Sequence, residues 1–409
     1  MTALQLGPPR WRAFAAVVAT AALLWSAPGA QAATAADATV GGDQLASPGQ
    51  TVRLLDGAKP LPTIKAASWV LADAETGEVL AHKGAHVERA PASTLKMLTA
   101  LTVLPRTDIN ATTVASKKAA SIYGTRVGLR AGKTYSLDDL WYAVFLPSAN
   151  DAAIAVAEAN GGVRPTIRQM NDVAYELRAL DTVAKSTNGL DAPGQRSSAY
   201  DLALFAREGL KNEDFARYAS TARTQFPNIK GKGTHTIYTT NRLLLHGWRG
   251  AIGVKTGFTS QAGRTFAGAA TRHGRTLIVT LMGIQESTEG AAKRLLTWGF
   301  KNADKVEPVG MLVEPGSPLP EESQPTEPSE ADQPTAEPTG SSSVPGSLVR
   351  ENGSAKGGGS GELAAAAPGT DAPGGLPLLG ILSAVLIAIG AIGLVAVRRP
   401  SHGKHSVES

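Results

Sequence analysis

The chain has 409 residues, 43% of them hydrophobic, so it can bury one large domain or two ordinary ones. It contains no cysteine, which excludes disulfide bonds, thiolate nucleophiles and cysteine-based zinc sites. The formal net charge of +5 combines a basic region before residue 306 with an acidic one after it. Since no basic cluster is interleaved with aromatic residues, we expect partners in an anionic cell envelope and no nucleic acid.

The N-terminus has the three parts of a secretory signal. Two arginines precede an apolar run from Ala13 to Trp25, and a small-residue cleavage site, Ala30-Gln31-Ala32, follows. The apolar run is too short to span about 30 Å of hydrocarbon, so we favour a signal peptide over a membrane anchor. We therefore assign residues 1–32 to a signal peptide and residues 33–62, which are small and polar, to an extended lead-in.

Residues 63–305 have the patterns of one domain with strands at both ends. Short β-type runs, the first two of them joined by a turn, cover Trp69–Ala72, Val79–Ala81, Ala251–Thr256, Thr265–Thr271 and Thr276–Met282. Helical signals cover Leu137–Phe145, Asp151–Ala159, Pro165–Leu180, Ala199–Leu210 and Glu289–Phe300. We predict an α/β (α+β) fold, in which both ends of the domain build one antiparallel sheet that is flanked by helices and has a mostly helical insert.

The C-terminal part of the chain predicts a tether. Residues 306–375 are rich in Pro, Ser, Glu and Gly and poor in large apolar residues, which is typical of a disordered linker. Residues 376–397 are uncharged and apolar over about 20 residues, enough for one transmembrane helix. The basic residues in 398–409 favour a cytoplasmic tail. We expect an exported domain held on the outer face of the cell membrane by a single pass.

A hydroxyl and an amine stand one helical turn apart in the segment 91–101. Ser93 and Lys96 have the i, i+3 spacing that places two side chains on one face of a helix. Their neighbours are almost all apolar, which indicates a buried helix, and lysine is rarely buried without a role. We interpret Ser93 as a nucleophile and Lys96 as its base. The spacing alone is weak, because Ser401 and Lys404 in the basic tail share it.

Two further motifs accompany this pair. Ser148-Ala149-Asn150 begins a predicted helix, and Lys255-Thr256-Gly257 ends a predicted strand. Ser-x-x-Lys, Ser-x-Asn and Lys-Thr-Gly in this order form the signature of penicillin-binding proteins and serine β-lactamases. Together with Leu295-Leu-Thr-Trp-Gly-Phe, these segments resemble the low-molecular-mass D-alanyl-D-alanine carboxypeptidases, the S11 peptidases, over about residues 63–305.

The resemblance implies a β-lactamase/transpeptidase-like fold and a serine hydrolase. Such an enzyme removes the terminal D-Ala from peptidoglycan stem pentapeptides through an acyl-enzyme, binds β-lactam antibiotics covalently, and needs no metal or cofactor. Its catalytic residues are the acylated serine, the proton acceptor and a hydroxyl that relays a proton, here Ser93, Lys96 and Ser148. Its substrate-binding residues hold the substrate backbone and the terminal carboxylate or form the adjoining strand edge, here Asn150, Lys255, Thr256, Gly257 and Phe258.

The chemistry itself explains why these residue types are needed. A serine hydroxyl is a poor nucleophile until a base removes its proton. A lysine acts as that base only when neutral, and an apolar setting or a second cation, here Lys255, lowers its pKa. The tetrahedral intermediate needs donors, for which the backbone N–H groups of Ser93 and Phe258 are candidates.

Three alternatives remain open. A class A β-lactamase deacylates with a glutamate on a loop after Ser-x-Asn, but residues 179–199 contain Asp181 and Asp191 and no glutamate, which disfavours that activity. A D-alanyl endopeptidase acting on cross-links would use the same residues. A non-catalytic envelope protein that binds penicillin or stem peptides would not need a nucleophile and its base.

Two other features qualify the resemblance. Many relatives bind the substrate carboxylate with an arginine after the final core strand, and residues 283–292 contain none, so Lys255, Thr256 or another arginine has to serve. His82 and His86 have the i, i+4 spacing of a metal-binding pair, but Lys83 stands where a metalloprotease needs glutamate. We therefore expect both histidines to lie at the surface.

Overall fold

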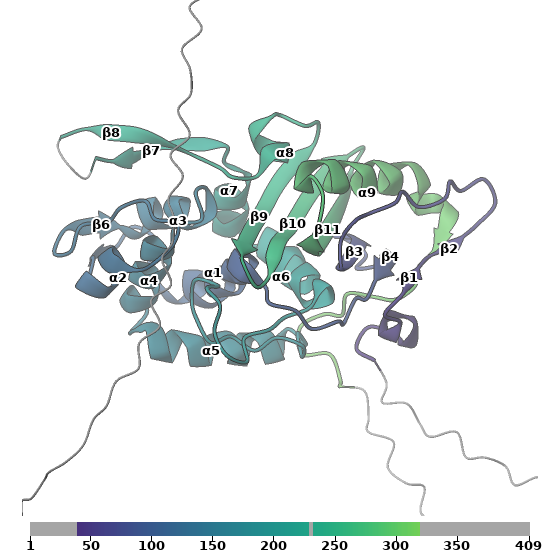
Figure 1. Cartoon of the computed structure of the whole chain (residues 1–409), viewed down its shortest axis with the longest axis horizontal. Helices are drawn as coiled ribbons and strands as arrows, with labels where there is room; N and C mark the ends of the chain where they lie inside the picture. Colours follow the sequence, from purple (N-terminus) through teal and green to yellow (C-terminus); the bar gives the residue numbers. More distant parts are fainter. Residues whose placement is uncertain (1–38, 229–231, 320–409) are drawn as a thin grey trace, which may run out of the picture. The chain divides into compact units, whose positions relative to one another are not determined.

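A six-stranded antiparallel sheet is the centre of the computed structural model, which describes residues 39–228 and 232–319 (Figure 1). The strand order is β1-β4-β3-β11-β10-β9. The strands are β1 (Gln50–Thr51), β3 (Ser68–Asp73), β4 (Val79–Lys83), β9 (Ala251–Thr259), β10 (Gly263–Arg272) and β11 (Arg275–Ile284). Because β3 pairs with β11, both ends of the domain meet in one sheet, and this part of the fold prediction is confirmed.

Helices and three small two-stranded sheets complete the described chain. The α-helices are α1 (Lys96–Val103), α2 (Lys117–Ser121), α3 (Leu137–Phe145), α4 (Asn150–Ala159), α5 (Val163–Glu176), α6 (Ala199–Lys211), α7 (Glu213–Ser220), α8 (Arg242–Leu245) and α9 (Thr288–Asn302). The paired short strands are β2 (Arg53–Leu54) with β12 (Val306–Glu307), β5 (Thr112–Val114) with β6 (Thr134–Ser136), and β7 (Arg223–Pro227) with β8 (Thr234–Tyr238). Four short 3-10 helices add to these, of which η2 (Ala92–Leu95) directly precedes α1.

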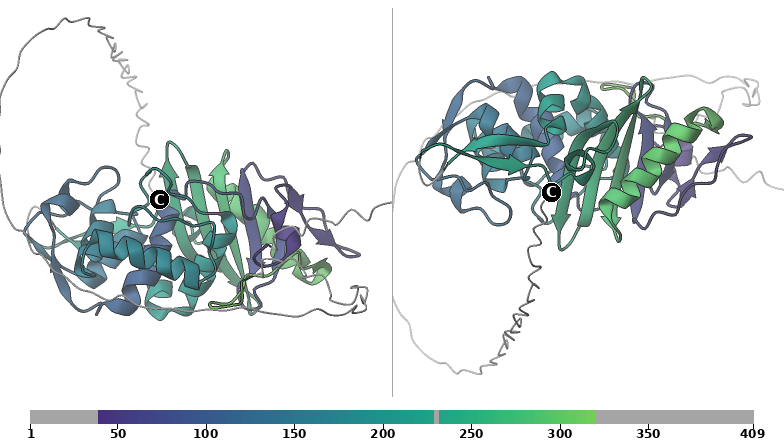
Figure 2. Two further views of the ribbon diagram at one scale, coloured as in Figure 1. Left: turned by 90° about the horizontal axis from the view of Figure 1, so that it is seen from below. Right: turned by 90° about the horizontal axis from the view of Figure 1, so that it is seen from above.

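The two faces of the sheet are covered by different helices (Figure 2). Side chains alternate along a strand, so neighbouring residues of β11 enter different clusters. Leu277 and Val279 pack with the apolar face of α9 in the smaller core cluster. Ile278 and Met282 pack in the larger cluster, which includes the buried residues of α1 and α6. The sheet is therefore buried on both sides, and its edge strand β9 borders the helical part.

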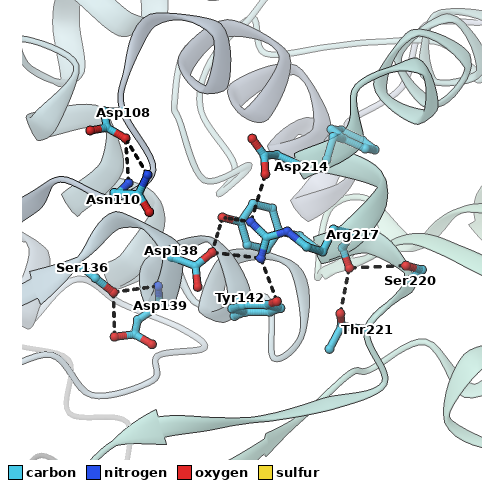
Figure 3. A network of polar contacts seen from close by, with 12 residues as sticks. Asp108, Asn110, Ser136, Asp138, Asp139, Tyr142, Asp214, Arg217, Ser220 and Thr221 are labelled. Carbon is cyan, nitrogen blue, oxygen red and sulfur yellow. Dashed lines mark hydrogen bonds and ion pairs between the residues drawn. The ribbon is translucent and has the colours of Figure 1, made fainter.

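A polar network fastens α3 to α7, as Figure 3 shows. Arg217 of α7 donates hydrogen bonds to Asp138 (3.0 Å) and Tyr142 (2.8 Å) of α3 and to Asp214 (2.9 Å) in its own helix. Ser136 caps α3 by accepting a hydrogen bond from the backbone N–H of Asp139. Since the chain turns directly from the C-terminus of α3 into the Ser148 motif, this network helps to fix that motif.

The folded unit extends beyond the predicted limits of residues 63–305 at both ends. β12 pairs with β2, and the Leu312 side chain is buried while its carbonyl accepts a hydrogen bond from Arg207 (3.1 Å). Residues 306–319 thus pack on the domain rather than begin the linker. The predicted signal peptide, the remaining linker and the predicted transmembrane segment lie outside the described residues. Within residues 39–228 and 232–319, no helix is both long and apolar enough to cross a bilayer.

Candidate active site

Ser93 and Lys96 meet in the turn that leads into α1. Ser93 lies in η2, and Lys96 is the first residue of α1 and is fully buried. Lys96 Nζ donates hydrogen bonds to Ser93 Oγ (2.9 Å), to Asn150 Oδ1 (2.8 Å) and to the backbone carbonyl of Asn188 (2.6 Å). The predicted nucleophile and base are therefore within hydrogen-bond distance, on a 3-10 turn and helix start rather than within one regular helix.

The surroundings of Lys96 favour its neutral form. Burial, and next the charge of Lys255, hold the pKa of Lys96 well below its usual value, against an opposing effect of Asp151. Burial also lowers the pKa of Lys255 to about 7. Burial and the neighbouring Lys255 charge thus both favour loss of the proton from the Lys96 ammonium group. A neutral Lys96 can then accept the proton of the Ser93 hydroxyl.

The Ser-x-Asn motif brings two more polar groups to the same place. Ser148 adopts a left-handed backbone conformation (φ 66°) in the turn before α4. Its hydroxyl is buried, lines the same cleft as Ser93, and has no hydrogen-bond partner among the described residues. Asn150 accepts from Lys96 and donates to the carbonyl of Tyr123 (2.9 Å). Asn150 therefore positions Lys96, a role additional to the one expected from the motif.

The Lys-Thr-Gly motif lies on β9, beside the nucleophile. Lys255 is buried, and its Nζ donates to the carbonyl of Thr256 (2.9 Å). A Cβ atom on Gly257 would lie only 2.8 Å from the Ser93 backbone nitrogen, so only glycine allows the strand to come this close. Phe258 follows and is 68% exposed. As the edge strand of the sheet, β9 leaves backbone groups open to an extended ligand.

The Asn188 carbonyl belongs to the site, although no sequence pattern indicates it. It accepts hydrogen bonds from Lys96 (2.6 Å) and Ser93 Oγ (3.5 Å). Gly189 is in the left-handed region (φ 77°), and a Cβ atom there would lie 2.0 Å from the carbonyl oxygen of Ala92. Backbone contacts of this kind depend on the path of a loop, and side-chain motifs do not encode them.

Asp151 is a second residue that the sequence analysis did not assign to the site. It follows Asn150 directly and is fully buried, and its carboxylate accepts from the backbone N–H groups of Val127 (3.0 Å), Gly128 (2.7 Å) and Leu129 (2.9 Å). It thus orders the loop beside the Ser-x-Asn turn. In the sequence, only its position directly after the Ser-x-Asn motif links Asp151 to the site.

Residues of all three motifs line a cleft of about 580 Å³, although the buried Lys96, Asn150 and Lys255 are not among its lining residues. Its walls include Ser93 and Ser148, the β9 residues Thr256, Gly257 and Phe258, and four charged side chains, Arg242, Arg264, Glu286 and Glu289. Asp181 and Asp191 do not line it. Asp181 pairs with His86 (2.8 Å), and Asp191 accepts from the Thr259 hydroxyl (2.8 Å).

The predicted surface position of the two histidines is wrong for His82. Its ring is fully buried, and Nε2 contacts the carbonyl of Gln44 (3.0 Å). His86 is partly buried in its pair with Asp181. His82 lies in β4, four of whose five residues are buried. The i, i+4 spacing of the two histidines does not indicate this burial.

Comparison with known proteins places the chain in a family. A family model described as D-alanyl-D-alanine carboxypeptidase, peptidase S11, matches residues 56–286, which include all three motifs. The chain belongs to the S11 family. It is 37% identical over 253 residues to the D-alanyl-D-alanine carboxypeptidase DacB2 of Mycobacterium tuberculosis, covering 60% of this chain and 85% of that protein. It is 33% identical to DacD of Escherichia coli, covering 60% of this chain and 66% of that protein.

Solved structures with the same fold agree with this membership. A D-alanyl-D-alanine carboxypeptidase from M. tuberculosis matches with a TM-score of 0.60 and 35% identity, over 63% of this chain and 99% of that one. The DD-transpeptidase of Streptomyces K15 matches with a TM-score of 0.57 and 29% identity, over 59% of this chain and all of that one. The S11 chain described here is therefore a serine hydrolase of the D-alanyl-D-alanine carboxypeptidase and penicillin-binding class.

Proposed function

We propose that this S11 enzyme removes the terminal D-Ala from peptidoglycan stem pentapeptides through an acyl-enzyme on Ser93. The observation that carries the assignment is the 2.9 Å hydrogen bond between Lys96 Nζ and Ser93 Oγ, within a fully buried setting that lowers the pKa of Lys96. A buried amine beside a hydroxyl, with a second amine nearby, is an activated nucleophile. Binding a peptide without cleaving it requires none of these groups.

Acylation follows from the positions of these groups. Neutral Lys96 takes the Ser93 proton as Oγ attacks the carbonyl carbon of the penultimate D-Ala. The C–N bond then breaks, and the leaving D-Ala amine receives a proton, for which the unpartnered Ser148 hydroxyl is the relay. Backbone N–H groups of Ser93 and Phe258 are the proposed donors to the oxyanion.

Water hydrolyses the ester in the second half of the reaction and releases the tetrapeptide. A β-lactam acylates Ser93 in the same way, but its ring-opened product stays attached to the protein. The two glutamates that line the cleft are engaged, Glu286 by Arg294 and Glu289 by Lys293. Neither is free to activate water as a β-lactamase glutamate does, which supports stable β-lactam binding.

We further propose that the enzyme works on the outer face of the cell membrane. The support is in the sequence, namely the signal-like residues 1–32, the apolar run 376–397 and the basic residues that follow it. Epitope accessibility on intact cells, compared with that of a variant lacking residues 376–397, tests this placement. Retention of the shortened protein in the membrane fraction would contradict it.

Covalent labelling by a fluorescent penicillin tests the acyl-enzyme. Wild-type protein should be labelled, and Ser93→Ala should not. Ser401→Ala, which removes the serine of the second Ser-x-x-Lys match, is the matched control and should keep the label. A parallel assay offers the wild type a stem pentapeptide and a cross-linked dimer. Cleavage of the dimer without release of D-Ala from the pentapeptide would identify an endopeptidase instead.

A further inference from the structure

The charged side chains that line the cleft differ in whether they are already paired. Glu286 accepts from the Lys65 backbone N–H (2.7 Å) and pairs with Arg294. Glu289 pairs with Lys293 (2.6 Å) and with a histidine, His246 (3.1 Å). Both negative charges in the wall are therefore neutralised within the protein.

The two arginines of the cleft have no such partners. The guanidinium groups of Arg242 and Arg264 make no hydrogen bond or ion pair with any residue that the structure describes, and both side chains are exposed. Other guanidinium groups of this domain do pair with carboxylates, among them Arg294 with Glu286 and Arg275 with Asp304. The cleft consequently offers uncompensated positive charge to an anionic ligand.

Strand register places Arg264 next to the Lys-Thr-Gly motif. Arg264 of β10 is paired with Phe258 of β9, and Thr265 with Gly257. Gly257 faces the nucleophile, so Thr256, Phe258 and Arg264 share the opposite face of the sheet. The diagonal neighbours Thr256 and Arg264 are about 7–8 Å apart at the backbone, within the reach of an arginine side chain.

Lys255 is poorly placed to bind a carboxylate alone. Its side chain is only 1% exposed, and its Nζ already donates to the Thr256 carbonyl (2.9 Å). Arg242, the second arginine that lines the cleft, is the first residue of α8 and does not belong to the sheet. Arg264 combines solvent access, a free fork of donors and a position beside the Thr256 hydroxyl, which are the requirements for bidentate recognition of a carboxylate.

We infer that Arg264 binds the terminal carboxylate of the substrate and sets the preference of this enzyme for a free C-terminus. The inference rests on the proposed function, because it assigns a substrate group to that site. Arg264 is thus a specificity-determining residue. Beside it lies the Thr256 hydroxyl, which makes a hydrogen bond with the Thr240 hydroxyl (2.6 Å).

The test uses the full chain and two substrates that differ in one group. Diacetyl-L-lysyl-D-alanyl-D-alanine is compared with its C-terminal amide in wild type, Arg264→Gln and Arg264→Lys. Loss of a charge-assisted bidentate contact should lower kcat/KM for the acid about 10- to 100-fold, and for the amide less than about threefold. Arg264→Lys should recover part of the loss on the acid, because it keeps the charge without the fork.

Controls separate this role from folding and from a rival arginine. Arg223→Gln changes an exposed arginine of β7 outside the cleft. It is the matched control and should leave both substrates unaffected, and thermal midpoints of all variants should agree. An equal loss on acid and amide, or no loss, in Arg264→Gln would overturn the inference. So would a loss confined to the acid in Arg242→Gln instead.

The role of Arg264 can be tested even if the wild type does not release D-Ala. Absence of D-Ala release by the wild type would refute the proposed function alone. The acylation rate with benzylpenicillin, compared with its methyl ester, then reports on Arg264. Wild type should prefer the free acid and Arg264→Gln should lose that preference. An unchanged ratio of the two rates would overturn the inference.

Discussion

Replacing Asn150 with aspartate tests whether acylation requires a neutral Lys96. Asn150 Oδ1 lies 2.8 Å from Lys96 Nζ, so the isosteric carboxylate puts a negative charge at that distance. With an effective dielectric constant of about 20, the two charges attract by about 6 kcal/mol. That energy equals roughly four pKa units. Burial opposes ionisation of the new carboxylate, so we expect the pKa of Lys96 to rise by at least about two units.

The expected consequence is slower acylation at neutral pH. Each unit by which the pKa of the base rises reduces its neutral fraction tenfold at a fixed pH below the pKa. At a pH below the wild-type pKa of Lys96, acylation by fluorescent penicillin should therefore fall by at least about 100-fold in Asn150→Asp, and the rising limb of its pH–rate profile should move to higher pH. The assay is stopped-flow or quenched labelling from pH 5 to 10.

Asn150→Leu is the matched control, since it removes the hydrogen bond without adding charge. Its limb should not move to higher pH, although its rate falls because Lys96 loses a positioning contact. A profile for Asn150→Asp that coincides with that of the wild type would refute the reasoning that Lys96 acts as the neutral base.

Three further substitutions test other parts of the site. Gly257→Ala should slow acylation about 100-fold, because the new Cβ atom would lie 2.8 Å from the Ser93 backbone nitrogen and displace the nucleophile; normal labelling kinetics would contradict this. Lys255→Gln removes the second cation and should raise the pKa of Lys96, so the rising limb of the acylation rate against pH should move to higher pH. A move to lower pH would refute the effect of the Lys255 charge on Lys96. Asp151→Ala leaves four backbone N–H groups without their acceptor and should lower the free energy of unfolding by about 2–5 kcal/mol in urea titrations; an unchanged midpoint would exclude that role.

Elements with strong periodicity and a cap were predictable from the sequence. The predicted helix Leu137–Phe145 has the bounds of α3, since its apolar face and the Ser136 cap both act locally. The sheet was predictable as well, because the apolar strands of β3, β10 and β11 are buried on both faces. Segments whose structure depends on distant partners were missed. β12 is two residues long and is defined only by its pairing with β2.

The site shows the same division between local and distant information. The three motifs indicated which side chains carry the chemistry, and the structure brings Ser93, Lys96 and Asn150 into direct contact. The carbonyl of Asn188 was not predictable, because any residue type supplies the same acceptor. The exposed position of Arg264 beside the cleft depends on the register of β10 against β9, which sequence spacing does not determine.

Mass spectrometry of the quenched reaction with a stem pentapeptide tests the central claim most directly. The account predicts a tetrapeptidyl ester on the peptide that contains Ser93, formed with release of one equivalent of D-Ala. It also predicts that Ser93→Ala yields neither product. An adduct on another residue, or D-Ala release by Ser93→Ala at the wild-type rate, would contradict the account.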